Sequence, residues 1–422
     1  MNILLTGITG FIGRHLAHAL REAGHRVIGV SRSGTGSDMV RGDFTKDLQP
    51  EVWVPRLRGI DVVINAAGIL RERGTQTFDA IHTRAPQALF AACVQSDVKR
   101  VIQISALGAD RGQSGYFRSK RAADDFLASL PLDWTIVQPS LVYGEGGTSA
   151  RLFTMLASLP VIGVPGHGEQ RVQPIHVDDV VAAVVALCER SMRRRAPLVG
   201  PQEMSFKELL LQLRAAMGLG RGRLLYVPMR FMRFAARIAE ISPHSLLDRE
   251  TLAMLEAGNV ADPSLTAQLL GRAPRGVKRF VDRGSRENVV RAAQLGWLLP
   301  LLRIGIALVW LWTGIVSLGL YPREESYELL HRTGVPADLA PMFLYGAATL
   351  DLLLGLATLL LRRRRLLWLA QIAVILAYTA IITAELPEFW LHPYGPVLKN
   401  IPMLIALYML YVLERPPWNT SS

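Results

Sequence analysis

The feature that most constrains the fold of this chain is a change of composition after about residue 296, where four long apolar stretches follow one another. A helix needs about 20 apolar residues to cross a bilayer, and no stretch before residue 296 runs that far without a charged residue. The last stretch is short, so it spans a bilayer only if Pro396 begins the helix and the Lys399 ammonium group reaches the interface. We therefore expect an all-α, four-helix transmembrane domain at residues 296–415, with spans at Leu298–Leu320, Pro341–Leu361, Leu366–Ala384 and Pro396–Leu413.

The distribution of charge predicts how these spans are oriented. Short loops rich in arginine and lysine stay in the cytoplasm during insertion, and the second and third stretches are joined by four arginines, Arg362–Arg365. Alternation places the segment before the first stretch on the same side, and that segment is also basic. The residues after Met1 do not form a charged and then apolar leader, so we expect no cleaved signal peptide. The sequence predicts a protein of a bacterial-type inner membrane, with residues 1–295 and both termini in the cytoplasm.

Composition excludes several other classes of protein. A net charge of +12 would by itself fit a nucleic-acid partner, but a mean hydropathy of +0.24 fits apolar spans flanked by arginines better. Cys93 and Cys188 are the only cysteines and form no CxxC pair, which excludes a disulfide framework. We expect a bilayer as partner, no nucleic acid and no metal site.

Three polar residues fall inside the expected spans. Asp351 lies near the middle of the second span, where an unpaired carboxylate costs at least about 2.5 kcal/mol. We expect it to face the interior of the bundle, either as a proton or substrate contact or as a structural acid that is protonated or paired with Arg303. Gln371 and Tyr378 on the third span are expected to form hydrogen bonds between helices rather than to bind a ligand.

The first residues of the chain form a strand, a glycine-rich turn, a helix and a second strand. The apolar run Asn2–Leu5 leads into the turn Thr6–Gly13, a helix follows until Gly24, and the next strand is Arg26–Val30. In such a βαβ unit the glycines allow a tight turn, let a pyrophosphate approach the backbone N–H groups at the helix N-terminus, and let the helix pack closely on the strand. The residues expected to bind a dinucleotide here are Thr6, Gly7, Thr9, Gly10, Phe11, Ile12 and Gly13.

The choice between the two nicotinamide cofactors depends on the end of the second strand. NAD enzymes usually place an acid there to bind the ribose 2′-hydroxyl, whereas this chain has Ser31 and Arg32 and no carboxylate. Arg32 could hold a 2′-phosphate, so we expect NADP(H), with NAD(H) as the alternative if Arg32 is a solvated turn residue. Asp43, after the third expected strand, either contacts the adenine or only forms a turn.

Two further strands end in residues suited to a cofactor and to catalysis. The strand Val62–Asn65 ends in small residues, Ala66, Ala67 and Gly68, against which a cofactor backbone can lie, and the strand Val101–Ile104 ends at Ser105. Tyr116 and Lys120 then follow with the spacing that places two residues on one helix face. An ammonium group beside a phenol would lower its pKa from about 10 towards neutrality, so that the tyrosine could exchange a proton with a substrate.

Taken together, these motifs resemble the short-chain dehydrogenase/reductase superfamily, in particular its extended and atypical branches. They cover about residues 3–200, in the order of the family: Thr6–Gly13, Asn65–Gly68, Tyr116–Lys120, Gln138–Gly144 and His176–Val180. The resemblance implies an α/β fold, that is, a doubly wound Rossmann sheet with a small substrate lobe.

The resemblance also implies roles for single residues. Tyr116 would be the acid/base, Lys120 would contact the nicotinamide ribose, and Pro139 would lie beside the nicotinamide. Asp178 and Asp179 are expected to cap a helix and to serve structure rather than catalysis. Ser105, the candidate third catalytic residue, stands only 11 residues before Tyr116. This short spacing resembles the atypical branch, which includes the nucleotide-binding accessory subunit of respiratory complex I and members that bind NADPH without evident turnover.

Residues 201–295 are expected to form the substrate lobe and linker after a Rossmann core at residues 1–200. Helices are predicted around Ser205–Met217, Met229–Ile241 and Arg249–Ala257. The second helix is basic and amphipathic, and it either lies on the membrane surface or covers the core of the lobe. The four-helix arrangement that follows, with its arginine-rich central turn, resembles the DoxX-like family.

The functional prediction is a membrane-anchored NAD(P)H-dependent oxidoreductase that acts on a carbonyl or hydroxyl group of a small, lipophilic substrate. One alternative is a non-catalytic NADPH-binding subunit or sensor of a respiratory-type membrane complex. Another is a nucleotide-sugar epimerase or dehydratase, for which Arg221, Arg223 and Arg230 offer weak support as diphosphate contacts.

Overall fold

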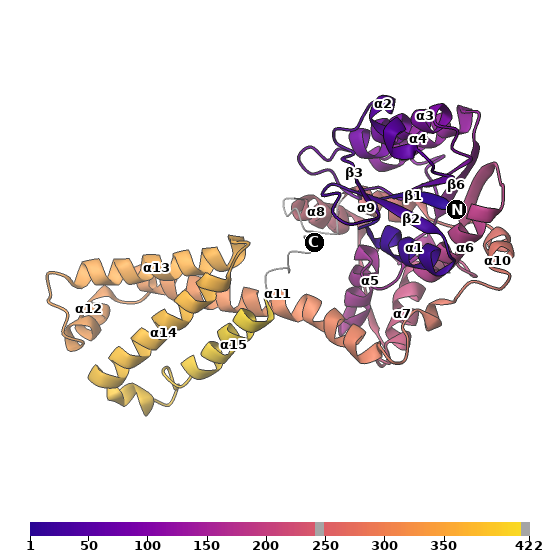
Figure 1. The fold of residues 1–422 in the computed structure, drawn as a ribbon. Coiled ribbons are helices and arrows are strands. Elements are labelled where there is room, and N and C mark those ends of the chain that lie inside the picture. The colour runs from indigo at the N-terminus through magenta and orange to yellow at the C-terminus, as the bar shows by residue number, and fades with distance from the viewer. Residues whose placement is uncertain (241–248, 415–422) are drawn as a thin grey trace. The chain divides into compact units, whose positions relative to one another are not determined.

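The computed structural model describes residues 1–240 and 249–414 of the chain (Figure 1). The predicted end of one lobe helix at Ile241 and the predicted end of the membrane domain at residue 415 lie outside the described residues. The chain divides into two compact units, Met1–Gln294 and a second that begins at Leu295. This division falls within one continuous helix, α11 (Arg286–Ile315).

A seven-stranded parallel sheet forms the centre of the first unit, in the order β11-β6-β5-β4-β1-β2-β3. The order reverses direction between β1 and β4, which is the switch point of a Rossmann sheet. Ile3, Leu4 and Leu5 are fully buried, as expected for a parallel strand covered by helices on both faces. The predicted fold class is confirmed. The strands are β1 (Asn2–Thr6), β2 (Arg26–Ser31), β3 (Met39–Arg41), β4 (Val62–Asn65), β5 (Arg100–Ile104), β6 (Asp133–Pro139) and β11 (Arg194–Leu198).

Helices cover both faces of this sheet (Figure 1). One core cluster packs α1 and α6 against it, and a second cluster packs α2, α3 and α4 against the opposite face. The two apolar cores make the sheet a rigid platform whose strand ends hold the site. The helices are α1 (Phe11–Glu22), α2 (Pro50–Trp53), α3 (Ala85–Gln95), α4 (Gly115–Ser129), α6 (Val177–Glu189) and α10 (Ser264–Leu270).

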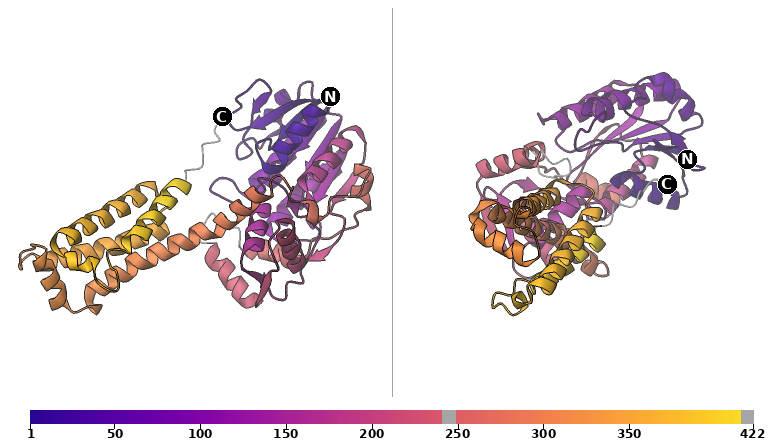
Figure 2. Two further views of the ribbon diagram at one scale, coloured as in Figure 1. Left: turned by 90° about the horizontal axis from the view of Figure 1, so that it is seen from below. Right: turned by 90° about the vertical axis from the view of Figure 1, so that its left-hand side faces the viewer.

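A smaller lobe with its own apolar core completes the first unit. Its core includes Tyr143, Phe153, Phe206 and Phe280, and three pairs of short strands support it. Figure 2 shows this part of the chain from two further directions. Its helices are α5 (Thr148–Ser158), α7 (Phe206–Ala216), α8 (Met229–Ala239) and α9 (Arg249–Ala257), and its strand pairs are β7 (Val142–Tyr143) with β10 (Ile175–His176), β8 (Val161–Pro165) with β13 (Arg223–Val227), and β9 (Arg171–Val172) with β12 (Met204–Ser205).

The second unit is helical, and the described residues include three helices long and apolar enough to cross a membrane. These helices correspond to the first three predicted spans. The prediction that Pro396 begins the fourth is wrong: Pro396 lies in a turn, and the helix begins at Asn400 and has 14 residues. At about 1.5 Å per residue it is roughly 21 Å long, shorter than the ~30 Å hydrocarbon core. The helices are α11, α12 (Arg323–Arg332), α13 (Ala340–Leu360), α14 (Arg365–Glu385) and α15 (Asn400–Leu413).

Polar side chains inside this bundle have mixed outcomes. Gln371 accepts a hydrogen bond from Trp310 (3.1 Å) and donates one to Thr358 (2.7 Å), which confirms its predicted role between helices. Asp351 is buried, with 4% of its surface exposed, as expected. Its predicted pairing with Arg303 is wrong, because Arg303 binds the carboxylate of Glu414.

Candidate cofactor and active site

The turn between β1 and α1 has no room for side chains at two of its glycines. Gly7 has a positive φ of 66°, and a Cβ atom there would lie 2.6 Å from the backbone of Ala66. A Cβ on Gly13 would lie 2.0 Å from the carbonyl oxygen of Gly7. Gly10 is the N-cap of α1 and is exposed, and the helix start has no side-chain cap. Uncapped N–H groups beside an exposed glycine fit the pyrophosphate of a dinucleotide.

The side chains around this turn divide into structural and accessible ones. Thr6 is fully buried and donates its hydroxyl to Asn65, which in turn donates to Gln103 at 2.7 Å. The Thr6 side chain therefore joins the ends of β1, β4 and β5, so any contact with a cofactor is left to its backbone. Thr9 is exposed, and Phe11 and Ile12 are half-buried at the start of α1.

The end of β4 is open towards solvent. Ala66 and Ala67 are half-buried, and Gly68 is exposed. A Cβ on Gly68 would lie 3.2 Å from Nζ of Lys120. The structure therefore brings the small-residue strand end, the glycine turn and Lys120 to one edge of the sheet, whereas Pro139 is buried at the end of β6 and accepts a hydrogen bond from Leu107 N (3.0 Å).

Arg32 is exposed after β2, at the position expected to bind a 2′-phosphate. The Ser31 hydroxyl accepts the N–H of Gly34 at 3.1 Å, which orders the loop after Arg32. Asp43 accepts hydrogen bonds from the N–H and the hydroxyl of Thr45 (3.0 and 2.8 Å). Burial opposes ionisation of Asp43, but these bonds and the charges of Lys46 and Arg32 lower its pKa. Asp43 therefore forms the turn that the sequence allowed.

Tyr116 lies near the start of α4 in an aromatic cluster. Its ring centroid is 5.3 Å from that of His82, 6.0 Å from that of Phe78 and 5.6 Å from that of Phe117. Burial raises the pKa of Tyr116 to about 12, and the charges of Asp124 and Glu250 raise it further. The prediction that Lys120 lowers this pKa towards neutrality is wrong, because burial of the phenol dominates. The phenol stays protonated at neutral pH and can act as a proton donor.

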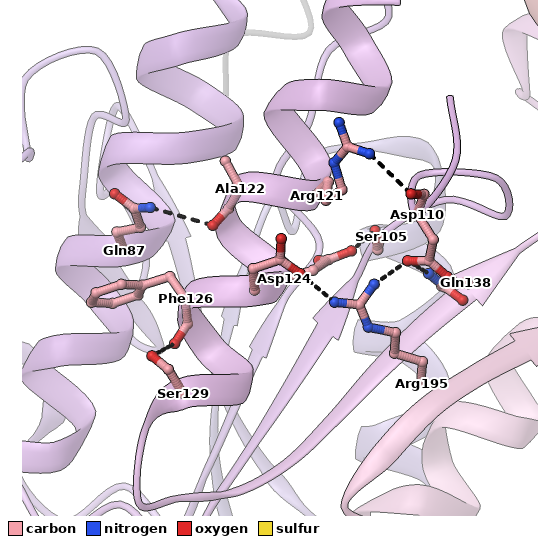
Figure 3. A network of polar contacts seen from close by, with 11 residues as sticks. Gln87, Ser105, Asp110, Arg121, Ala122, Asp124, Phe126, Ser129, Gln138 and Arg195 are labelled. Atoms are coloured by element: carbon pink, nitrogen blue, oxygen red, sulfur yellow. Dashed lines mark hydrogen bonds and ion pairs between the residues drawn. The ribbon is translucent and has the colours of Figure 1, made fainter. Parts of the chain in front are cut away.

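Lys120, Asp124 and Ser105 form a buried polar group beside the tyrosine. The Lys120 ammonium group donates to the carbonyl of Ile104 at 3.1 Å. Burial lowers the pKa of Lys120 to about 8, while Asp124 raises it. Burial raises the pKa of Asp124 to about 7. Ser105 donates its hydroxyl to Asp124 (Figure 3), so the structure directs this hydroxyl to Asp124, and a catalytic role for Ser105 stays a prediction.

A polar network holds the loop that leads from Ser105 to Tyr116 (Figure 3). Arg195 on β11 pairs with Asp110 in this loop and with Asp125 on α4. Gln138 on β6 donates to the Asp110 carboxylate at 3.0 Å. These contacts fix the short loop at both ends.

Three residues at Tyr116 carry no recognisable motif in the sequence. His82 accepts the N–H of Ile69 at Nε2 (3.0 Å) and bonds Ser119 through Nδ1 (3.0 Å), and burial lowers its pKa to about 2. Glu250 on α9 accepts the backbone N–H of Tyr116 at 2.7 Å. Asp124 follows Lys120 by four residues, which is the one spacing that could have identified it.

Asp178 and Asp179 have structural roles, although they are not the helix cap. The N-cap of α6 is His176, whose ring accepts the N–H of Asp178. Asp179 is fully buried and accepts hydrogen bonds from Arg272 (2.6 Å) and from the N–H of Arg275 (2.7 Å). The two acids therefore tie α6 to the segment after α10, and the capping role predicted for them is wrong.

Comparison with known families assigns each unit separately. Residues 3–197 match the NAD dependent epimerase/dehydratase family, and residues 307–408 match the DoxX-like family. The named cofactor of the first family agrees with the glycine turn at the sheet switch point.

Curated relatives match the first unit. A ceramide reductase of Caulobacter vibrioides is 32% identical over 214 residues, which are 48% of this chain and 64% of the relative. NADH dehydrogenase [ubiquinone] 1 alpha subcomplex subunit 9 of Arabidopsis thaliana mitochondria is 31% identical over 225 residues, 48% of this chain and 54% of the relative. The chain thus spans between about half and two thirds of these two relatives.

Solved structures share the fold. Human epimerase family protein SDR39U1 with NADPH has a TM-score of 0.52 and 19% identity and covers 70% of this chain and 98% of its own. UDP-glucuronic acid 4-epimerase of Bacillus cereus with UDP-glucuronic acid and NAD has a TM-score of 0.51 and 19% identity and covers 69% of this chain and 99% of its own. One fold serves many activities, so these structures support a dinucleotide-binding fold and leave the choice of cofactor open.

Proposed function

We propose that this chain, which joins a domain of the NAD-dependent epimerase/dehydratase family to a DoxX-like membrane domain, is a membrane-anchored NAD(P)H-dependent oxidoreductase. The observation that carries the proposal is the position of Lys120 at the open strand end beside Gly68, one helical turn from a protonated Tyr116. This arrangement places a proton donor and a cation next to the edge where a dinucleotide fits. The division at residue 200/201, and the cytoplasmic location of residues 1–295 and both termini, remain part of the proposal; the four arginines Arg362–Arg365 support that orientation.

The protonation state of Tyr116 favours carbonyl reduction as the direction of the reaction. A bound reduced nicotinamide supplies the hydride. Tyr116 then donates its proton to the alkoxide oxygen of the substrate, since an alkoxide is far more basic than a phenolate. The Lys120 ammonium group stabilises the negative charge left near Tyr116.

The membrane domain and one relative point to the class of substrate. A chain held in a bilayer meets lipids at high local concentration, and the name of the Caulobacter vibrioides relative, ceramide reductase, describes a reductase of a lipid. We therefore assign to this chain a lipophilic carbonyl compound resident in the membrane.

NADPH fluorescence tests this function directly. The full chain is purified in detergent, NADPH is added, and its fluorescence is recorded before and after addition of a membrane lipid extract. We expect enhanced fluorescence on binding and a decay only with the extract. Bound NADPH that no extract oxidises would contradict the proposal and favour the second candidate.

The second candidate is a non-catalytic NADPH-binding subunit of a membrane complex. The contact that favours it is the hydrogen bond from Ser105 to Asp124, which withdraws the third catalytic hydroxyl from a substrate. The relative named as a subunit of NADH dehydrogenase agrees with it. This candidate binds the same cofactor by the same glycine turn and shows no turnover.

We propose that Arg32 selects NADP(H) over NAD(H). Substitution Arg32→Ala should weaken NADPH binding by roughly 10- to 100-fold, because a hydrogen bond to a charged group contributes about 1.5–3 kcal/mol. NADH binding should change less than about threefold by the same reasoning. Both affinities are measured by fluorescence titration, with Arg58→Ala, an equally exposed arginine on the same domain, as the control. An equal loss for both cofactors would refute the role of Arg32.

A further inference from the structure

Helix α8 presents large apolar side chains to solvent. Phe231, Phe234 and Ile238 are 53%, 64% and 52% exposed. Their spacing of three and four residues places them on one face of the helix, whereas Ala236, on another side, is buried. Leu225 and Tyr226 on β13, just before the helix, are also about half exposed (55% and 49%). The alternative that this apolar face covers the core of the lobe is therefore wrong.

Three arginines lie beside this apolar face. Arg230, Arg233 and Arg237 are exposed and repeat with the same spacing, one position before each apolar residue. The Arg230 guanidinium group lies 4.9 Å from the centroid of the Phe231 ring. The helix sequence MRFMRFAARIA contains three arginines and no acid, a local charge of +3. An exposed aromatic face flanked by arginines is the pattern of helices that lie in a membrane interface.

The bilayer is the partner that matches both properties of this face. Anionic lipid headgroups complement the three arginines, and the acyl region below them accommodates phenylalanine and isoleucine. The same polypeptide contains helices long and apolar enough to cross a membrane, so every copy of the first unit is tethered to a bilayer. A soluble protein partner would need a second recruitment step, whereas the bilayer needs none.

We propose that α8 is an interfacial helix that lies in a bilayer containing anionic lipids. Phe231, Phe234 and Ile238 enter the acyl region, and Arg230 and Arg237 bind phosphate groups. Arg233 is shared with Glu256 on α9, to which it pairs at 2.8 Å.

Contacts of α9 connect this membrane surface to Tyr116. Glu250 on α9 accepts the N–H of Tyr116, and Met254 packs on the cluster of Phe78, Tyr116 and Phe117. Helix α8 packs on α9 through the pair of Arg233 and Glu256. If the proposed function holds, the lipid-facing helix is thus one element away from the proton donor, and it provides the entrance for a lipophilic substrate.

A single fluorescent label tests the position of α8 in the full chain. The label, nitrobenzoxadiazole, is attached to Phe234→Cys; Cys93 and Cys188 are buried and leave the new thiol as the reactive one. The protein is placed in nanodiscs of phosphatidylcholine with 30 mol% (about one third, enough to make the surface anionic) phosphatidylglycerol, and lipids with nitroxide-labelled acyl chains serve as quenchers. The control is Val94→Cys on α3, an apolar residue that is 38% exposed.

We expect the label at position 234 to shift to the blue and to be quenched several-fold more strongly than the label at position 94. Quenching should weaken in discs of phosphatidylcholine alone, and also when Arg230→Gln and Arg237→Gln are combined. Equal quenching at the two positions would overturn the proposal. A blue shift that appears without lipid and grows with protein concentration would also overturn it, because a second copy of the chain would then cover the face.

This test is independent of catalysis. The label reports position without cofactor or substrate, and NADPH binding is measured on the same samples. Normal quenching with no oxidation of NADPH would contradict the proposed function and leave the interfacial helix in place. Normal oxidation with no quenching would do the reverse.

Discussion

Substitution Tyr116→Phe should abolish turnover while the affinity for NADPH stays within a few-fold. The phenylalanine keeps the ring contacts with Phe78, His82 and Phe117 and removes only the proton that the alkoxide receives. Loss of a general acid costs about 10²- to 10⁴-fold in rate. The measurement is the rate of NADPH oxidation with lipid extract, together with a fluorescence titration of the cofactor.

A matched control for this variant is Tyr143→Phe. Tyr143 is also a buried tyrosine, and burial raises its pKa to about 12 as well, but it packs in the core of the small lobe and stacks on Phe280 at 4.9 Å. Its activity should stay close to that of the unmodified protein. Equal rates for Tyr116→Phe and the unmodified protein would refute the assigned role, and an equal loss in both variants would show that any buried hydroxyl matters for stability alone.

Local patterns were enough to predict the nucleotide-binding core. The glycine turn, the buried strands and the small residues at Ala66–Gly68 each carry their information within a few neighbouring residues, and the parallel sheet brings their ends together. The same holds for the three long spans, because length and apolar character are local properties. The position of Lys120 beside Gly68 follows from the sheet order that these motifs imply.

Distant contacts could not be predicted from the sequence. Glu250 meets Tyr116 across 134 positions of the chain, and His82 reaches Ser119 across 37. The direction of the Tyr116 pKa shift was wrong for the same reason: the spacing to Lys120 is local, whereas the burial that dominates comes from aromatic rings on other elements. Arg303 likewise pairs with Glu414, 111 residues away, and not with Asp351.

Substitution Gly13→Ala should destabilise the nucleotide-binding unit itself. The added methyl group would lie 2.0 Å from the carbonyl oxygen of Gly7 and 3.0 Å from Cα of Ile8, both of them backbone atoms. Overpacking a rigid site costs typically about 1–3 kcal/mol and sometimes more, and this backbone is held by the buried end of β1, so we expect a loss at or above about 3 kcal/mol. The midpoint of thermal unfolding, followed by tryptophan fluorescence of the full chain in detergent, should fall by several degrees without any cofactor present.

Substitution Gly10→Ala should have the opposite profile, and the contrast between the two glycines tests the geometry of the site. A Cβ on Gly10 would approach Gly7 O only to 3.0 Å, and the residue is exposed at the helix start. The unfolding midpoint without cofactor should therefore stay nearly unchanged, while NADPH affinity falls by about tenfold or more, because the methyl group keeps the pyrophosphate from N–H groups whose bonds contribute about 1.5–3 kcal/mol each. Gly276→Ala, where an added Cβ meets nothing within 4 Å, should change neither quantity. Unaltered NADPH affinity in Gly10→Ala would show that the pyrophosphate does not lie on α1, and the cofactor site proposed here would then have to be abandoned.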